Sequence, residues 1–268
     1  MTVEGTTLST GAGTYTATFT PKISYIWSDG TTSAKNVTWK IIGQGIAVPS
    51  QSGTLTYTGD SRTPSWSNYD NTKVSITGTT SATDAGTYYA TFVIINKDVY
   101  AWDDGTNNAK VVEWTISKAP LTIPSQNGTL TYNETAQDVS WSNYQSTYMK
   151  VSGSTRKTEA GEYYAMFTLK DTNHCWSDGS TDSKFVVWTI GKQVLATPYL
   201  ATTSYQFKAA EWEPTITNFN GSTMIKQGQT TATRAGSYVI VVKVKNQTSQ
   251  IFANGEYAVV LQDRKSVV

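Results

Sequence analysis

Short runs of alternating apolar and polar residues recur along this chain, and such alternation is typical of β-strands with one buried face. In residues 88–94, every second side chain from Tyr88 onward is apolar, and the same parity returns in the runs that begin at Tyr15, Tyr163 and Tyr238. A face that stays apolar in all four runs must be the core face. A second strand pattern, Val-x-Trp-x-Ile, occupies residues 37–41, 112–116 and 186–190. We therefore expect an all-β protein.

The strand patterns belong to a repeat of about 75 residues. The motif Ala-Gly-x-Tyr occupies residues 12–15, 85–88, 160–163 and 235–238, at steps of 73, 75 and 75 residues. The motif Trp-x-Asp-Gly occupies residues 27–30, 102–105 and 176–179, and a diverged copy occupies 252–255. A period of this length suits a small domain and is too long for one turn of a solenoid. Short strands separated by turn residues within it predict an antiparallel sandwich.

These markers predict an elongated array of immunoglobulin-like β-sandwiches in tandem. We expect a partial domain at residues 1–45, which lacks its N-terminal strands, and full domains at 46–119 and 120–193. A divergent terminal domain follows at residues 194–268. The connections between them are very short, so we expect little freedom between neighbouring domains.

The corner before each Tyr-led strand resembles part of the immunoglobulin fold. The run Asp-Ala-Gly-Thr-Tyr-Tyr-Ala at residues 84–90 is similar to the corner where an immunoglobulin tyrosine bonds back to the backbone. That resemblance implies a hydroxyl bond from Tyr88 to nearby backbone. Ala90 stands where antibody domains have a disulfide cysteine, so these repeats have no inter-sheet bridge, and Trp66 and Trp114 are expected to fill the core.

Over residues 5–193 the repeats resemble a bacterial Ig-like repeat. The resemblance rests on Ser-Gly-Thr-Leu-Thr-Tyr at 52–57, Ser-Trp-Ser-Asn-Tyr at 65–69, and the corner, turn and closing motifs given above. It fades in residues 194–268. Repeats of this kind are found in virion and tail proteins of phages of Gram-positive bacteria, and in bacterial surface proteins. The resemblance implies an exposed architecture and brings no catalytic residue.

The two end repeats depart from the pattern. About 38 residues precede Ala85 in the second repeat, whereas only 11 precede Ala12, so the first repeat lacks two or three strands and should expose half of a core. Three explanations remain open: the chain is a piece of a longer protein, another subunit supplies the strands, or this end is frayed. The last repeat gains Trp212, where the others have Arg62 and Gln137. It is either a diverged cap or a contact for a partner or glycan, with Trp212 on a loop.

Candidate chemistry is sparse. Asp29, Asp103, Asp104 and Asp178 recur in the Trp-x-Asp-Gly turns, but one or two carboxylates per turn fit turn chemistry better than calcium. One cysteine, Cys175, and one histidine, His174, cannot form a zinc site, and we interpret Cys175 as a small apolar filler. We find no catalytic residue, cofactor site or metal site, and expect no enzyme activity.

Charge and length narrow the partners. With a net charge of +1, we expect no strong electrostatic attraction to nucleic acid, and no apolar run reaches the length of a membrane span. The leading hypothesis is a structural and adhesive module of a phage virion, on a tail or capsid appendage, within a homo-oligomeric assembly of virion or surface-protein subunits. Without a signal-like N-terminus, the sequence favours the virion surface over export. The alternatives are a bacterial cell-surface adhesin that binds glycan or protein through its terminal domain, and accessory domains beside an enzyme.

Overall fold

The computed structural model of the chain describes residues 1–206, 210–234 and 236–262. Phe207 and Ala235, which belong to the repeated strand and corner patterns, lie outside these residues. Within the described residues the secondary structure is β throughout, with no helix. The chain forms two compact units: Met1–Leu121 with Asp171–Cys175, and Thr122–Lys170 with Trp176–Val268.

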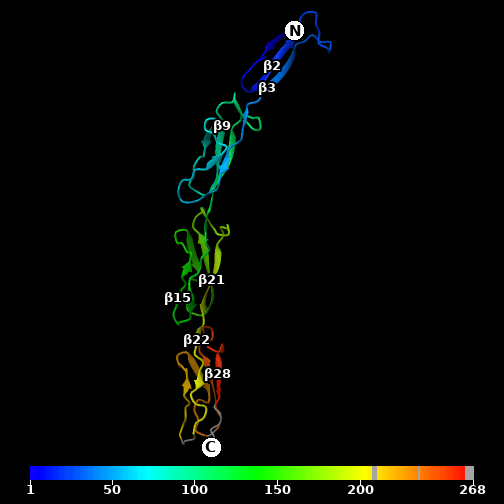
Figure 1. Ribbon diagram of the computed structural model, residues 1–268. Helices are drawn as coiled ribbons and strands as arrows, with labels where there is room; N and C mark the ends of the chain where they lie inside the picture. Colours follow the sequence, from blue (N-terminus) through cyan, green and yellow to red (C-terminus); the bar gives the residue numbers. More distant parts are fainter. Residues whose placement is uncertain (207–209, 235, 263–268) are drawn as a thin grey trace. The chain divides into compact units, whose positions relative to one another are not determined.

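In the first unit, the first repeat is a single antiparallel sheet in the order β1-β2-β3 (Figure 1). Its strands are β1 (Thr2–Gly5), β2 (Gly13–Thr20) and β3 (Lys35–Ile41). The register joins Val3 to Phe19 in β1 and β2, and Tyr15 to Trp39 in β2 and β3.

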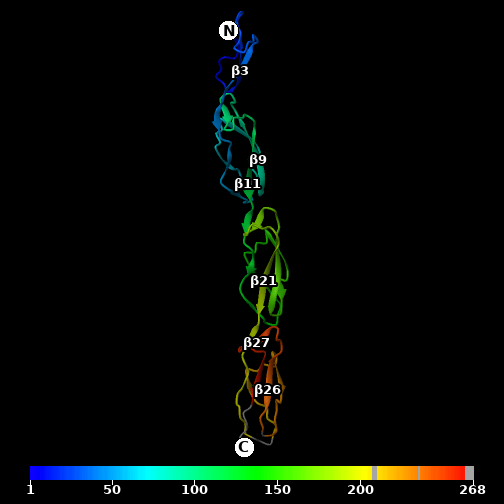
Figure 2. The same ribbon diagram turned by 90° about the vertical axis from the view of Figure 1, so that its right-hand side faces the viewer.

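The second repeat has the same sheet with a second layer packed on it. The large sheet has the order β6-β11-β9-β8, and β5 pairs with β7 in the opposite layer. Figure 2 shows β9 and β11 side by side, in an antiparallel register that joins Tyr88 to Trp114. The strands of this repeat are β4 (Gln44–Ile46), β5 (Ser50–Ser52), β6 (Leu55–Thr56), β7 (Ser65–Ser67), β8 (Val74–Gly78), β9 (Gly86–Ile94), β10 (Tyr100–Trp102) and β11 (Lys110–Ser117).

The core of the second repeat lies between these layers. Phe92, Trp102, Trp114 and Ile116 are each at most 2% exposed. Trp66, from β7, packs edge-on against Phe92 with ring centroids 4.9 Å apart. The predicted parity is confirmed, and so is the core role of Trp114; Trp66 is half-buried and closes the core from the opposite layer.

The second unit holds most of the third repeat and the fourth. Their large sheets have the orders β14-β21-β19-β17 and β25-β26-β28. The third repeat consists of β12 (Ala119–Leu121), β13 (Ser125–Gln126), β14 (Leu130–Thr131), β15 (Gln137–Asp138), β16 (Trp141–Ser142), β17 (Met149–Gly153), β18 (Arg156–Lys157), β19 (Gly161–Leu169), β20 (His174–Trp176) and β21 (Lys184–Gly191). The fourth consists of β22 (Gln193–Leu195), β23 (Tyr199–Leu200), β24 (Ile216–Thr217), β25 (Met224–Gly228), β26 (Val239–Val244), β27 (Gln250–Phe252) and β28 (Ala258–Gln262).

The tyrosine corner predicted from the resemblance is present in every repeat. The Tyr88 hydroxyl donates to the Asp84 carbonyl at 2.7 Å. The other three corner bonds join Tyr15 to Gly11, Tyr163 to Glu159, and Tyr238 to Arg234. Each bond spans four residues, so it fixes the chain reversal just before the central strand.

The connections between repeats are themselves strands. The strands β4, β12 and β22 begin two or three residues after the preceding repeat ends, and they pair with β10, β20 and β27 respectively. The β4–β10 and β22–β27 pairings are parallel. Each connection therefore belongs to the sheet structure of the repeat that follows it.

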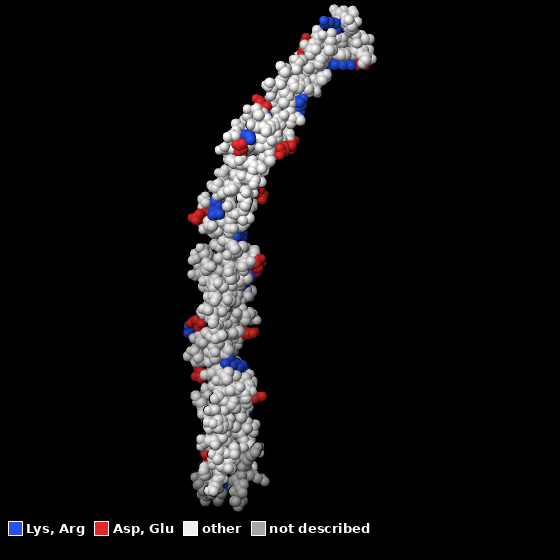
Figure 3. All heavy atoms as spheres, in the orientation of Figure 1, with Lys and Arg blue, Asp and Glu red and all other residues white. Residues whose placement is uncertain are grey.

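Charged side chains are scattered over the surface. In the view of Figure 3, lysine and arginine alternate with aspartate and glutamate, with wide uncharged areas between them. Several acidic side chains pair directly with a lysine, as Asp104 does with Lys110.

Candidate functional site

The Trp-x-Asp-Gly turns use their aspartates internally. In the second repeat the Trp102 indole donates to the Asn108 carbonyl at 2.7 Å. One carboxylate oxygen of Asp104 accepts from the backbone and hydroxyl of Thr106, at 2.9 and 2.6 Å, and the other accepts from Lys110 at 2.5 Å.

The same arrangement recurs in two other turns. Asp29 is bonded to Lys35 and Asp178 to Lys184, while the hydroxyl next to each turn also bonds the carboxylate. The hydrogen bond from Lys35, helped by those from Thr31, lowers the pKa of Asp29 to about 2. Both oxygens of each carboxylate already accept hydrogen bonds, which supports turn chemistry over calcium binding. In the described residues, no three His, Cys, Asp or Glu side chains gather as metal ligands would.

Trp212 lies outside the strands, at an isolated bridge in the segment between β23 and β24. Its backbone exchanges hydrogen bonds of 2.9 Å with Ala232, and its ring lies 5.1 Å from the ring of Tyr205. The side chain is half-buried. Arg62 makes the equivalent bridge with Ala82 in the second repeat, so this backbone pairing recurs although the side chain differs. A partner contact through Trp212 stays a prediction.

A more defined candidate site is a pocket of about 400 Å³ in the second repeat. Trp66, Tyr69 and Tyr100 supply its aromatic lining. Trp66 and Tyr69 both pack on Phe92, with centroid distances of 4.9 and 5.7 Å. Packing on the core fixes these rings, so the lining is preformed, as small-molecule sites usually are.

A neutral ion pair supplies the polar side of this pocket. Asp70 and Lys73 line it and lie 3.0 Å apart. The hydrogen bonds from Thr72, followed by the one from Lys73, lower the pKa of Asp70 to about 2. Lys73 also lies 5.8 Å from the centre of the Tyr100 ring. The charges cancel, so the pocket presents aromatic rings and hydrogen-bonding groups without a net charge.

The polar side of this pocket is specific to the second repeat. Trp141 and Tyr144 repeat the aromatic floor in the third repeat. The positions of Asp70, Lys73 and Tyr100, however, hold Gln145, Tyr148 and His174 in the third repeat, and Asn220, Thr223 and Gln250 in the fourth. The His174 and Gln250 side chains are buried there, whereas Tyr100 is half-buried.

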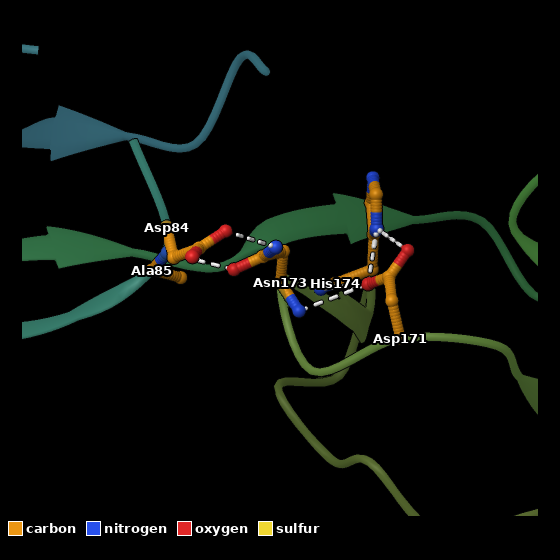
Figure 4. Close-up of polar contacts among 5 residues, drawn as sticks. All are labelled: Asp84, Ala85, Asp171, Asn173 and His174. Atoms are coloured by element: carbon orange, nitrogen blue, oxygen red, sulfur yellow. Dashed lines mark hydrogen bonds and ion pairs between the residues drawn. The ribbon is translucent and has the colours of Figure 1, made fainter. Parts of the chain in front are cut away.

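A second candidate site, which recurs along the chain, joins the corner of one repeat to the next repeat. Figure 4 shows Asn173 facing Asp84 and Ala85 within the first unit. The Asn173 amide oxygen accepts from the Ala85 N–H at 2.8 Å, and its nitrogen donates to the Asp84 carboxylate at 2.8 Å. The neighbouring His174 ring nitrogen lies 2.8 Å from Asp171, and its ring meets Tyr57 edge-on at 5.4 Å.

Equivalent junction contacts occur in both units. In the second unit the Ala160 N–H donates to the Ser249 hydroxyl at 2.7 Å, and Glu159 accepts from Ser249 and Asn246 at 2.5 and 2.8 Å. These bonds, with that from Ser249 first, lower the pKa of Glu159. In the first unit, the Ala12 N–H donates to the Asp98 carbonyl at 2.6 Å.

Sequence reasoning missed both sites. The junction contacts come from residues that differ between repeats, Asp98, Asn173 and Ser249, so no recurring motif marked them. The pocket was missed because its floor recurs and was assigned to the core. The signal that could have found it is the departure from the repeat: Asp70 and Lys73 are charged, whereas the aromatic residues beside them recur in the third repeat.

No protein-family model matches the chain, and the search of curated proteins found no similar sequence.

Proposed function

We propose that the chain is a non-enzymatic structural module, built of tandem immunoglobulin-like sandwiches, that spaces and displays weak binding surfaces. The junction contact carries this proposal. In three repeats the equivalent backbone N–H, that of Ala12, Ala85 or Ala160, donates a hydrogen bond to a residue of the following repeat. Such a contact adds nothing to the core of either repeat, and its effect is to restrict motion between neighbours.

A phage tail or capsid appendage, exposed on the virion, fits a module of this kind best. A bacterial cell-surface protein is the alternative location, and accessory domains beside an enzyme are the third reading. The evidence for the virion is the resemblance of the repeats to those of virion proteins. No helix in the described part of the chain is long and apolar enough to cross a membrane.

The location is tested by electron microscopy with antibodies raised against the purified chain. Gold labels on virus particles are expected. Labels confined to the bacterial envelope would overturn the virion proposal in favour of the cell-surface alternative.

The spacing role is tested by distance measurements between repeats. Spin labels at Lys150 and Gln227, which are exposed, report on the third and fourth repeats once Cys175 is replaced by serine. The unmodified junction should give a narrow distance distribution, and Ser249→Ala should broaden it. A distribution that is already broad with Ser249 in place would show that the junction restricts nothing.

The pocket of the second repeat favours one further activity, the binding of a neutral carbohydrate. Aromatic rings cover the apolar face of a sugar, and the Asp70–Lys73 pair and nearby amides can hydrogen-bond its hydroxyls. A glycan array probed with the chain tests it. The variant D70N/K73T/Y100Q carries the residues of the fourth repeat and should lose the signal, whereas Gln145→Asn in the third repeat should keep it. Retained binding by the triple variant would exclude this pocket.

A further inference from the structure

The first repeat exposes the face that forms the core of the other repeats. Val37 is 52% exposed and Val3 is 44% exposed, and both lie on this face of the sheet. Phe19, Trp39 and Ile41 are half-buried, although their counterparts Phe92, Trp114 and Ile116 are at most 2% exposed. A contiguous apolar face of this kind on a soluble protein marks an interaction surface.

The counterpart strands are identified by their geometry. Gly5 ends β1 at a φ of 82°, and Gly78 ends β8 at 85°. A Cβ atom on Gly5 would lie 2.6 Å from the Thr16 carbonyl oxygen, and one on Gly78 would lie 3.0 Å from that of Tyr89. Both glycines therefore allow the same close approach to the neighbouring strand. The indoles of Trp39 and Trp114 likewise donate to equivalent carbonyls, those of Thr6 and Thr79. The first repeat thus keeps the counterparts of β8, β9 and β11 and has no strand in place of β4 to β7 or of β10.

In the second and third repeats, segments of the chain itself cover the equivalent face. In the second repeat, Leu55 of β6 pairs in parallel with Ile116, and the Gln51 side chain bonds both the N–H and the carbonyl of Thr115, at 2.9 and 3.0 Å. In the third repeat Leu130 pairs with Ile190.

The glutamine contact also recurs in the third repeat, where Gln126 bonds Thr189 at 2.8 and 3.0 Å. Both covering segments contain Ser-Gln-x-Gly-Thr-Leu-Thr-Tyr, followed eight residues later by Ser-Trp-Ser-Asn-Tyr. These two copies, in the second and third repeats, therefore define the sequence pattern that fits the face.

The matching edge of the first repeat is open. β3 is the outer strand of its sheet, and within the described residues no strand pairs with its free side. Lys40 occupies the position of Thr115 there. Ile26 is 67% exposed, where its counterpart Ala101 is covered by the parallel strand β4.

We propose that this face and edge bind an extended segment from outside residues 1–268 that carries the pattern of residues 44–69. The segment pairs in parallel with β3, its glutamine bonds the backbone of Lys40, and its leucine and tryptophan cover Ile41 and Phe19. Strand addition of this kind uses backbone bonds for affinity and side-chain pockets for specificity. A second copy of this chain is a poor donor, because its own segments are already paired within the second and third repeats.

A labelled peptide of residues 44–69 tests the proposal on the full chain. We expect saturable binding at one peptide per chain, together with slower hydrogen exchange of residues 14–20 and 35–41. The peptide variant Leu55→Asp should bind at least about tenfold more weakly, because it places a charge in the apolar contact.

Two chain variants form a matched pair. Val37→Lys changes an exposed residue on the binding face and should weaken binding about tenfold or more, while Thr38→Lys, on the opposite face, should leave it within about twofold. Equal effects of the two variants, or no peptide binding, would overturn the proposal. So would a dimer formed through this face without peptide, or full protection of residues 14–20 in the peptide-free monomer. None of these outcomes depends on the junction restricting motion or on the virion location.

Discussion

Replacement of matched tryptophans tests how the two layers stabilise each repeat. Trp114 is 1% exposed, stacks on Tyr88 at 4.8 Å, and donates to the Thr79 carbonyl at 2.7 Å. Trp39 makes the same contacts, with Tyr15 at 4.9 Å and the Thr6 carbonyl at 2.9 Å. The second layer is what distinguishes them: it covers Trp114 and is missing over Trp39.

The magnitudes follow from this difference. Deletion of a buried tryptophan costs about 3–5 kcal/mol, and the unpaired carbonyl left behind adds about 1 kcal/mol. Trp114→Ala should therefore lower the free energy of unfolding of the second repeat by about 4–6 kcal/mol. Trp39→Ala, which loses only about half of that burial, should cost the first repeat about 2–3 kcal/mol. A domain of this size has roughly 4–11 kcal/mol in total, at about 0.05–0.15 kcal/mol per residue.

Native-state hydrogen exchange resolves the repeats separately. Amides of β9 report on the second repeat and amides of β2 on the first. Trp188 of the third repeat is 0% exposed, so Trp188→Ala serves as a replicate of Trp114→Ala. Equal losses for Trp39→Ala and Trp114→Ala would refute the argument, because they would show that the second layer contributes nothing to the cost. An unchanged β9 in Trp114→Ala would refute it more directly.

Three further outcomes are expected. The folded pKa of Asp29, about 2, lies below its ordinary value of 3.8, so its contribution to the turn is present above about pH 4 and is lost as the pH falls toward 2; carboxyl NMR titration should show this, and Lys35→Met should raise the midpoint. A chelator should leave the melting temperature unchanged, whereas a fall of more than about 4 °C, or about 1 kcal/mol, would restore the calcium interpretation. Asn173→Ala should speed exchange at the Ala85 amide, while Asn107→Ala, which removes a bond to Lys97 and none to Ala85, should leave that amide unchanged.

Much of the fold was predictable because it depends on patterns that every repeat must satisfy. Alternation in residues 88–94 identified β9 and its buried face, since a register shift of one residue would expose Phe92. The corner bond of Tyr88 was predicted from the resemblance of residues 84–90 to the immunoglobulin corner, and it is confirmed. The count of residues before Ala12 predicted two or three missing strands, but the strands β4 to β7 and β10 all lack counterparts there, because several strands of the second repeat are only two or three residues long.

The rest depended on contacts between segments far apart in the sequence. Cys175 was expected to be an apolar filler, but it is only half-buried, because it alternates on β20 with the buried His174 and Trp176. The isolated bridge of Trp212 with Ala232 was not predicted, since a single bridge between residues 20 apart leaves no periodic signal. The junction contact of Asn173 with Ala85 spans 88 residues and uses one side chain, so no local pattern could reveal it.

The Ala-Gly-x-Tyr motif recurs because one corner meets two demands at once. The tyrosine hydroxyl bonds back to the residue four positions earlier, which turns the chain into the central strand. The same reversal turns the alanine N–H outward, where no partner within its own repeat accepts it, and the next repeat supplies the acceptor as Asn173 or Ser249. The donor can be invariant because it is backbone, while the acceptor can change from carbonyl to amide to hydroxyl. A substitution that keeps the tyrosine bond but removes the acceptor should therefore free neighbouring repeats without unfolding either.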